Sequence, residues 1–238
     1  MSTFFLVSFL SVAAVAGYDY ELHVQSTKAA REAMSKWDDK YLLQIFQGFD
    51  DGMGSSQFNT VWQSVPKAEL QELSGEYCLS WNNPIIASFK RTVGTNEILK
   101  KYSSDGSSEF GLGKSVSYGC TGQWSEPADF LPSNKVEVQN NANFNYKAIL
   151  YSKGTNDEYM PFYTSPVLIP SSALRGSPVV KLKLRFGLKL GAGAFVGDID
   201  GLETEEVDLT VVNSRTVCID KVRGTDHVVF KSDKCPDE

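Results

Sequence analysis

A run of strictly alternating residues constrains the fold of this chain more than any other feature. From Val180 to Leu190 every even position is apolar and every odd position is basic or glycine. Such alternation predicts a β-strand with one apolar face, whereas a helix would bury several lysines. The expected apolar face comprises Val180, Leu182, Leu184, Phe186, Leu188 and Leu190, and the opposite face Lys181, Lys183, Arg185 and Lys189. A strand of this length needs partners on both edges, which favours a large antiparallel sheet or a barrel.

The amino terminus is typical of a secretory signal peptide. Met1–Ala16 carries no charge, has an apolar core at Phe4–Leu10 and ends in small residues. This core is shorter than the ~20 residues that span a bilayer, and no later stretch is long and apolar enough to do so as a helix. We therefore expect a secreted, extracellular protein in which residues 17–238 form a single β-rich domain.

Charge and cysteine content limit the partners of the chain. The formal net charge of −6 disfavours a nucleic-acid partner. Four cysteines in an oxidising compartment predict two disulfides from three possible pairings. The pairing of Cys78 with Cys120 and of Cys218 with Cys235 is favoured because short loops close at the lowest entropic cost. Zinc ligation is the alternative, but the chain has no C-x-x-C pair and only two histidines, so we predict no metal site.

An amphipathic helix is predicted over residues 27–47. Apolar residues recur there at spacings of three and four, Ser26 or Thr27 provides a cap, and Gly48 provides a stop. The helix is expected to pack against the sheet, although a membrane-lying helix or a lid would show a similar pattern. A shorter helical turn is expected at Lys67–Glu72.

The rest of the chain is predicted to be β-structure joined by turns. A meander is expected in the first part, prolines mark two later strands as edge or irregular strands, and hairpins close the chain. The predicted strands are Glu76–Trp81, Ile85–Val93, Glu97–Tyr102, Lys135–Gln139, Phe144–Tyr151, Tyr159–Tyr163, Val167–Ile169, Val207–Val212, Thr216–Val222 and His227–Lys231. The fold class is therefore mainly β: one antiparallel barrel or sandwich preceded by a helix.

No motif predicts a catalytic residue or a cofactor. The chain lacks a G-x-S-x-G elbow, and His227 has no identifiable partner for acid–base chemistry. The acidic run from Asp198 to Asp208 begins like a calcium loop, but it lacks the glycine and the last glutamate of that motif. We expect it to pair instead with the basic face of the alternating strand.

One short segment resembles the lipocalin-like barrels. Gly75-Glu76-Tyr77 and Cys78-Leu79-Ser80-Trp81 follow a helical turn and open a run of strands, as the G-x-W strand of those barrels does, with Tyr77 in place of the tryptophan. The order of elements is similar too. The resemblance implies a barrel that carries a small apolar ligand.

Three functions remain open at this stage. The first is a non-enzymatic binding protein for a small apolar molecule or lipid, with Leu182, Leu184, Phe186 and Leu188 lining the cavity, unless these side chains simply fill a core. The second is a lectin-like or adhesive recognition module that uses Trp62, Trp81, Trp124 and an Asn-rich loop. The third is a pore-forming protein that inserts Val179–Val196 as an amphipathic strand.

Overall fold

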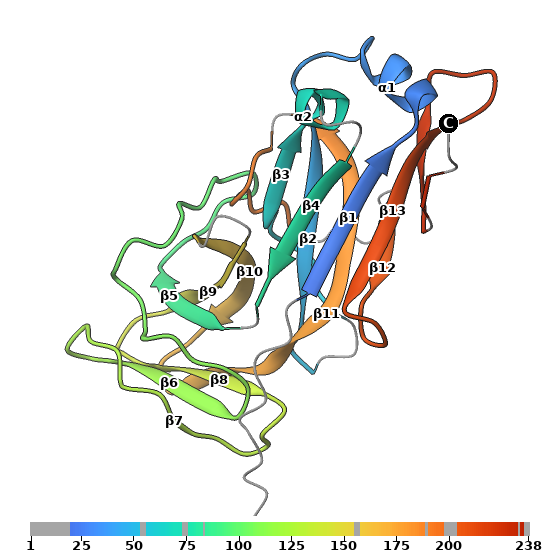
Figure 1. The fold of residues 1–238 in the computed structure, drawn as a ribbon. Coiled ribbons are helices and arrows are strands. Elements are labelled where there is room, and N and C mark those ends of the chain that lie inside the picture. The colour runs from blue at the N-terminus through green and yellow to red at the C-terminus, as the bar shows by residue number, and fades with distance from the viewer. Residues whose placement is uncertain are drawn as a thin grey trace, which may run out of the picture.

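The structure is a computed structural model that describes residues 20–52, 56–72, 76–82, 84–154, 158–188, 190–197, 204–232 and 234–235. The predicted signal peptide lies outside these residues, as do Lys189 and the first part of the acidic run. The described chain is mainly β, with three separate sheets and two short helices (Figure 1). No helix in these segments is long and apolar enough to cross a membrane.

The first sheet has four strands in the order β14-β13-β1-β4. Its members are β1 (Tyr20–Ser26), β4 (Glu76–Trp81), β13 (Ser214–Lys221) and β14 (Val228–Lys231). β1 runs parallel to β13 and antiparallel to β4, so the sheet is mixed. β1 was not predicted from the sequence.

The second sheet is antiparallel in the order β10-β9-β5. It contains β5 (Ile85–Lys90), β9 (Tyr146–Lys153) and β10 (Tyr159–Leu168). As the prolines predicted, β10 is an edge strand, and its register shifts near Pro161 and Pro166.

The third sheet has seven strands and is organised by the alternating strand. It contains β2 (Tyr41–Asp50), β3 (Gln63–Pro66), β6 (Lys114–Gly119), β7 (Ala128–Asp129), β8 (Val136–Asn141), β11 (Ser172–Leu188) and β12 (Glu205–Asp208). The first part of β11 pairs with β8, and its later part pairs with β2 and β12. β11 therefore links the two ends of the molecule (Figure 1). β6 and β8 are parallel, so this sheet is mixed too.

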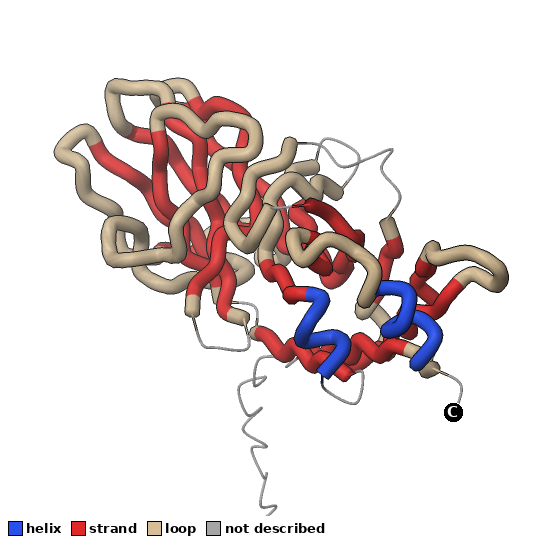
Figure 2. The backbone as a smooth tube through the Cα atoms, turned by 90° about the horizontal axis from the view of Figure 1, so that it is seen from above, coloured by secondary structure: helices blue, strands red, loops and turns tan. Residues whose placement is uncertain are grey.

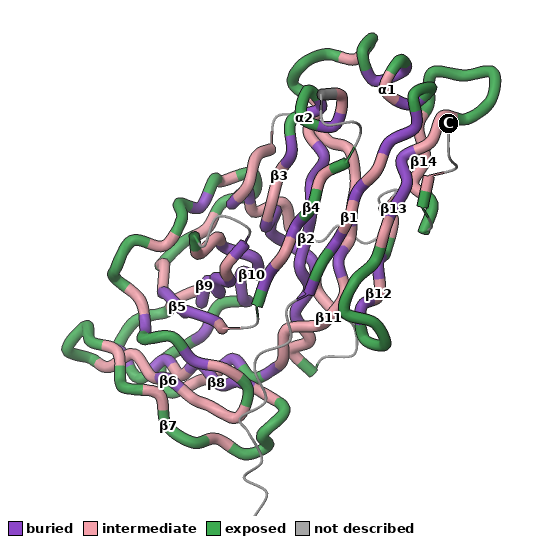
Figure 3. The backbone as a smooth tube through the Cα atoms, in the orientation of Figure 1, coloured by how far each residue is buried: buried purple, intermediate pink, exposed green. Residues whose placement is uncertain are grey.

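The prediction of a single barrel is wrong, and with it the resemblance to lipocalins. Among the described strands, no sheet closes on itself. The predicted meander does not form, because β4 and β5 belong to different sheets and Glu97–Tyr102 is not a strand. Instead, the main apolar core gathers buried side chains from all three sheets. Figure 3, which colours the backbone by burial, shows that buried residues are concentrated along the strands.

The predicted helix over residues 27–47 is wrong beyond its first turns. α1 covers only Lys28–Met34, with Thr27 as its cap: Ala30 N–H donates to Thr27 Oγ1 at 3.1 Å. The chain then turns at Asp38, whose carboxylate accepts from Lys40 N–H. The apolar residues after that turn belong to β2, which lies between β3 and β11 and is buried on both faces. Pairing with these two strands outweighs the local helical pattern.

The two faces of β11 follow the predicted alternation in its central part. Leu182 and Leu184 are 0 % exposed and belong to the main core. On the opposite face, Lys181 pairs with Glu206 at 2.8 Å and with Asp208 at 3.2 Å, which confirms the predicted pairing with the acidic run at this position. The strand ends at Leu188, and Leu190 instead packs in a second apolar cluster beside Phe46.

The helices lie next to each other (Figure 2), near one end of the strands β1, β3 and β4 (Figure 1). α2 (Lys67–Glu72) confirms the predicted helical turn. The loop from α1 to β2 contacts α2, because Lys67 of α2 donates to the backbone carbonyl oxygen of Trp37 in this loop. The Trp37 ring lies beside Phe186, near the end of β11.

Candidate functional site

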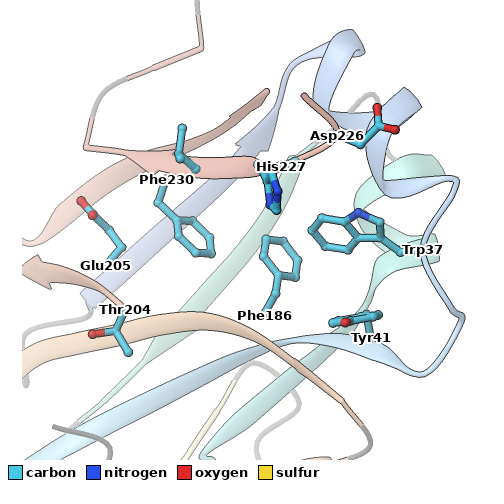
Figure 4. A pocket seen from close by; sticks show the side chains of 10 residues that line it. Trp37, Tyr41, Phe186, Thr204, Glu205, Asp226, His227 and Phe230 are labelled. Carbon is cyan, nitrogen blue, oxygen red and sulfur yellow. The ribbon is translucent and has the colours of Figure 1, made fainter. Parts of the chain in front are cut away.

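An open cleft lies between the end of β11 and strand β14. Its volume is about 660 Å³, and Figure 4 shows the side chains that line it. One wall comes from the seven-stranded sheet and the loop before β2, and the other comes from the four-stranded sheet. The lining residues are Trp37, Tyr41, Phe186, Thr204, Glu205, Asp226, His227, Val228, Val229 and Phe230.

Aromatic rings dominate the interior of the cleft. The ring of Phe186 lies against Phe230 at 5.3 Å between centroids with an interplanar angle of 9°. It also meets Trp37 edge-on at 5.1 Å, and Trp37 lies 5.3 Å from Tyr41. All four rings are only partly buried, so part of their apolar surface faces the opening. Aromatic rings of this kind offer a large apolar area for a ligand.

His227 is a polar side chain that points into the cleft. Its imidazole is directed toward Phe186, between Phe230 and Trp37 (Figure 4). The ring nitrogens have no hydrogen-bond partner among the described residues. The imidazole can therefore donate to or accept from a polar group of a ligand.

The two carboxylates at the rim are occupied by other protein groups. Asp226 pairs with Lys36 at 2.9 Å and with Lys221 at 3.3 Å, and these two lysines lower the pKa of its carboxyl group. Glu205 accepts from Ser232 Oγ at 2.5 Å. Both carboxylates point away from the interior (Figure 4). The interior is therefore apolar apart from His227 and the hydroxyls of Tyr41 and Thr204.

The four side chains that the sequence predicted to line a cavity lie in three different environments. Leu182 and Leu184 fill the core, and Leu188 is 50 % exposed beyond the cleft. Of these four residues only Phe186 lines the cleft, and it lies two residues beyond the end of the pairing between β11 and β12 at Leu184. Sequence reasoning missed Trp37 and Tyr41, which were assigned to a helix, and Phe230, which was assigned only to a strand.

Trp37 is held in the cleft wall by the buried ammonium group of Lys67. Lys67 Nζ donates to the carbonyl oxygens of Trp37 and Met34, and it pairs with Asp39 at 2.9 Å. The ammonium thus satisfies the end of α1 and fixes the loop that carries the indole.

We expect Lys67→Met to destabilise the protein by about 1–3 kcal/mol, since two carbonyl oxygens lose their charged donor. Urea denaturation measures this loss. Lys40→Met is the matched control, because Lys40 pairs with Asp38 on the surface and its removal should cost little. Equal destabilisation by both variants would contradict the role assigned to Lys67.

A disulfide stabilises the wall of the cleft that is formed by β14. Among the described strands β14 pairs only with β13, and the Cys218–Cys235 bond joins β13 to the segment after β14 across 17 residues. This half of the predicted pairing is confirmed. The other half is wrong: Cys78 and Cys120 are unbonded and exposed, because β4 and the end of β6 belong to different sheets.

Strand β12, which carries Glu205, is anchored by Asp208. The hydroxyl and the backbone N–H of Thr210 donate to its carboxylate at 2.6 and 2.9 Å, and with Lys181 they lower its pKa to about 2. A lowered pKa in the folded state adds stability above the ordinary value of 3.8, and this stability disappears as the pH falls to about 2.

We expect Asp208→Asn to lower the urea midpoint at neutral pH, because asparagine cannot provide the ionised acceptor. The difference in urea midpoint between the wild-type protein and the variant should become smaller as the pH falls from about 3.8 to about 2. Urea midpoints measured across this range test the assignment. A difference that does not depend on pH would contradict it.

The tryptophans expected to contact sugars do not form a common surface. Trp62 and Trp81 are buried against each other in the core, with ring centroids 5.4 Å apart. Trp124 is partly exposed, and its indole N–H donates to the carbonyl oxygen of Asp105. In the Asn-rich loop, Asn140 is buried and donates to the carbonyl oxygens of Phe144 and Leu168.

The segment expected to insert into a membrane is folded against its neighbours. Its glycine-rich part pairs with the segment before β3, where Val61 N–H donates to the carbonyl oxygen of Ala194 and Gly193 N–H donates to that of Val61. The pore function stays a prediction.

Comparisons with known proteins add no relative. The chain matches no family model, no curated protein and no solved structure. Within the described residues, no group of three or more His, Cys, Asp or Glu side chains is arranged to hold a metal ion. The function must therefore be argued from the cleft itself.

Proposed function

We propose that this chain is a non-enzymatic binding protein that takes up a small, largely apolar molecule in the cleft between β11 and β14. The observation that carries this proposal is the set of partly exposed aromatic rings, Trp37, Tyr41, Phe186 and Phe230, which face one opening. Ring surface left accessible in this way gains free energy when a ligand removes it from water.

The size of the cleft suits such a ligand. Small-molecule sites commonly enclose about 300–1,000 Å³ and combine apolar walls with a few polar groups. The cleft has about 660 Å³, aromatic walls and one inward-pointing imidazole. A flat or ring-shaped apolar molecule with one polar group near His227 would satisfy these features together.

Secretion is part of the same proposal. The Cys218–Cys235 disulfide is typical of proteins that fold in an oxidising compartment. Carriage of an apolar molecule outside the cell requires apolar surface that removes part of the molecule from water, and the aromatic walls of the cleft support this role.

Native mass spectrometry of the protein purified from its own source tests the proposal. We expect a mass above that of the polypeptide, which organic extraction removes and which returns when the extract is added back. A polypeptide that carries no extractable compound and binds nothing from an apolar extract of its source would contradict the proposal.

Two matched variants locate the binding. Phe230→Asp places a charge in the cleft, and Phe144→Asp makes the same change at an exposed ring outside it. Rebinding of the extracted compound should be lost in Phe230→Asp and kept in Phe144→Asp. Loss in both variants or in neither would exclude the cleft as the site.

A further inference from the structure

A second pocket lies on the three-stranded sheet, away from the aromatic cleft. It has a volume of about 420 Å³ and is formed by β5 and β9 together with the segment from Glu97 to Asp105. Its floor is polar, whereas the interior of the cleft is mostly aromatic. None of its lining residues belongs to the cleft.

The floor of this pocket presents a hydroxyl hydrogen that no protein group accepts. Ser88 Oγ and Tyr151 OH lie 3.0 Å apart, and both residues are only 6 % exposed. Their mutual bond uses one of the two hydroxyl hydrogens, and neither oxygen has another partner in the described part of the chain. Burial raises the pKa of Tyr151, so its hydroxyl keeps its proton. A buried donor of this kind is costly unless a ligand or water accepts it.

The rim supplies one charge of each sign. The Lys100 ammonium and the Asp105 carboxylate have no hydrogen-bond or ion-pair partner within the described segments. The neighbouring Lys90 and Lys101, by contrast, pair with Glu97 and Glu158. The pocket thus offers both donors and acceptors to a ligand.

Tyr102 forms an aromatic side of the pocket. Its ring lies 5.8 Å from that of Tyr151, and its backbone N–H donates to the carbonyl oxygen of Tyr159. Gly106 lets this ring approach, because a Cβ there would lie 2.7 Å from Tyr102 Cε2 and 2.4 Å from the carbonyl oxygen of Ala87. The ring is only partly buried, so some of its surface remains for a ligand.

We infer that this pocket binds a carbohydrate. Sugar hydroxyls both donate and accept, so one sugar ring can satisfy the Ser88–Tyr151 floor together with Lys100 and Asp105. The apolar C–H groups of the same ring can lie against Tyr102. A purely apolar ligand would leave the floor hydroxyl unpaired, and a simple anion would offer no donor to the Asp105 carboxylate. The inference does not depend on the function proposed for the cleft.

Saturation-transfer difference spectroscopy with methyl glycosides tests the inference. The probes are the methyl glycosides of glucose, mannose, galactose and N-acetylglucosamine at millimolar concentrations. At least one should bind to the wild-type protein. Asp105→Ala should weaken that binding about tenfold, because it removes a charged acceptor, and Ser88→Ala should weaken it several-fold.

The controls separate this pocket from other surfaces. Asp129→Ala removes an exposed carboxylate on β7 and should leave sugar binding unchanged, as should Trp37→Ala in the cleft. The inference is overturned if no methyl glycoside binds, or if Asp105→Ala and Ser88→Ala bind as the wild-type protein does. Loss of sugar binding in Trp37→Ala alone would show that the sugar binds in the cleft, and this result would also overturn the inference.

Discussion

Leu182→Lys is expected to prevent this chain from folding. Leu182 is 0 % exposed on β11 and lies opposite Gln47 of β2 and Val207 of β12, with no carboxylate in either register position. Loss of the leucine alone costs about 2–5 kcal/mol, and a buried ammonium group adds to this cost. The sum approaches the whole stability of a typical domain. Circular dichroism of the purified variant should show no cooperative thermal transition.

The neighbouring position on the same strand provides the control. Lys183 points to the other face, where its ammonium lies 4.7 Å from the centroid of the Phe58 ring. Lys183→Leu keeps an apolar stem on this face and buries no charge, so we expect a change of about 1 kcal/mol or less. Equal destabilisation by the two substitutions would mean that the two faces of β11 are not distinguished as described.

Loss of the Cys218–Cys235 disulfide is expected to have the second largest effect. A disulfide that closes a loop of this size stabilises a protein by about 3 kcal/mol. β14 pairs with no other described strand than β13, so the wall that carries His227 and Phe230 should loosen first. The double variant Cys218→Ala/Cys235→Ala should therefore unfold at lower urea concentration and expose Phe230.

The unbonded cysteines allow a matched comparison. Cys78→Ala/Cys120→Ala removes two exposed thiols and should leave the urea midpoint nearly unchanged. Thiol titration of the unreduced wild-type protein should find these two groups reactive. A large stability loss in this second variant would indicate a bond between Cys78 and Cys120.

The sequence predicted the fold best where the determining contacts are local. The alternation around Leu182 and Leu184 places one face of β11 in the core, as observed. The cap at Thr27 and the short helix after Pro66 also depend on neighbouring residues, and both are confirmed.

The failures arose where distant strands decide the structure. Tyr41–Asp50 has helical spacing, but β3 and β11 bond to its backbone and make it a buried strand. β1 pairs in parallel with β13, which lies nearly two hundred positions later in the chain, and no local sequence pattern predicts that pairing. The pairing of Cys78 failed for the same reason, since loop length does not show to which sheet each cysteine belongs.

The candidate site could be predicted only in part. Phe186 was recognised from the alternation on β11, whereas Trp37 and Phe230 reach the same opening through a turn and a disulfide-linked hairpin. The convergence of these three rings is a property of the tertiary structure. The polar pocket below Tyr102 depends likewise on a loop that returns to β5 and β9.

Titration with N-phenylnaphthylamine, a flat apolar fluorophore, tests the central claim that the cleft binds such molecules. Of the four tryptophans, Trp37 lines the cleft, while Trp62 and Trp81 are buried in the core and Trp124 lies near Asp105. We expect saturable binding of one fluorophore per chain, with energy transfer that falls strongly in Trp37→Phe and affinity that falls at least tenfold in Phe230→Asp. Binding that does not saturate, or that is the same in both variants as in the wild-type protein, would contradict it.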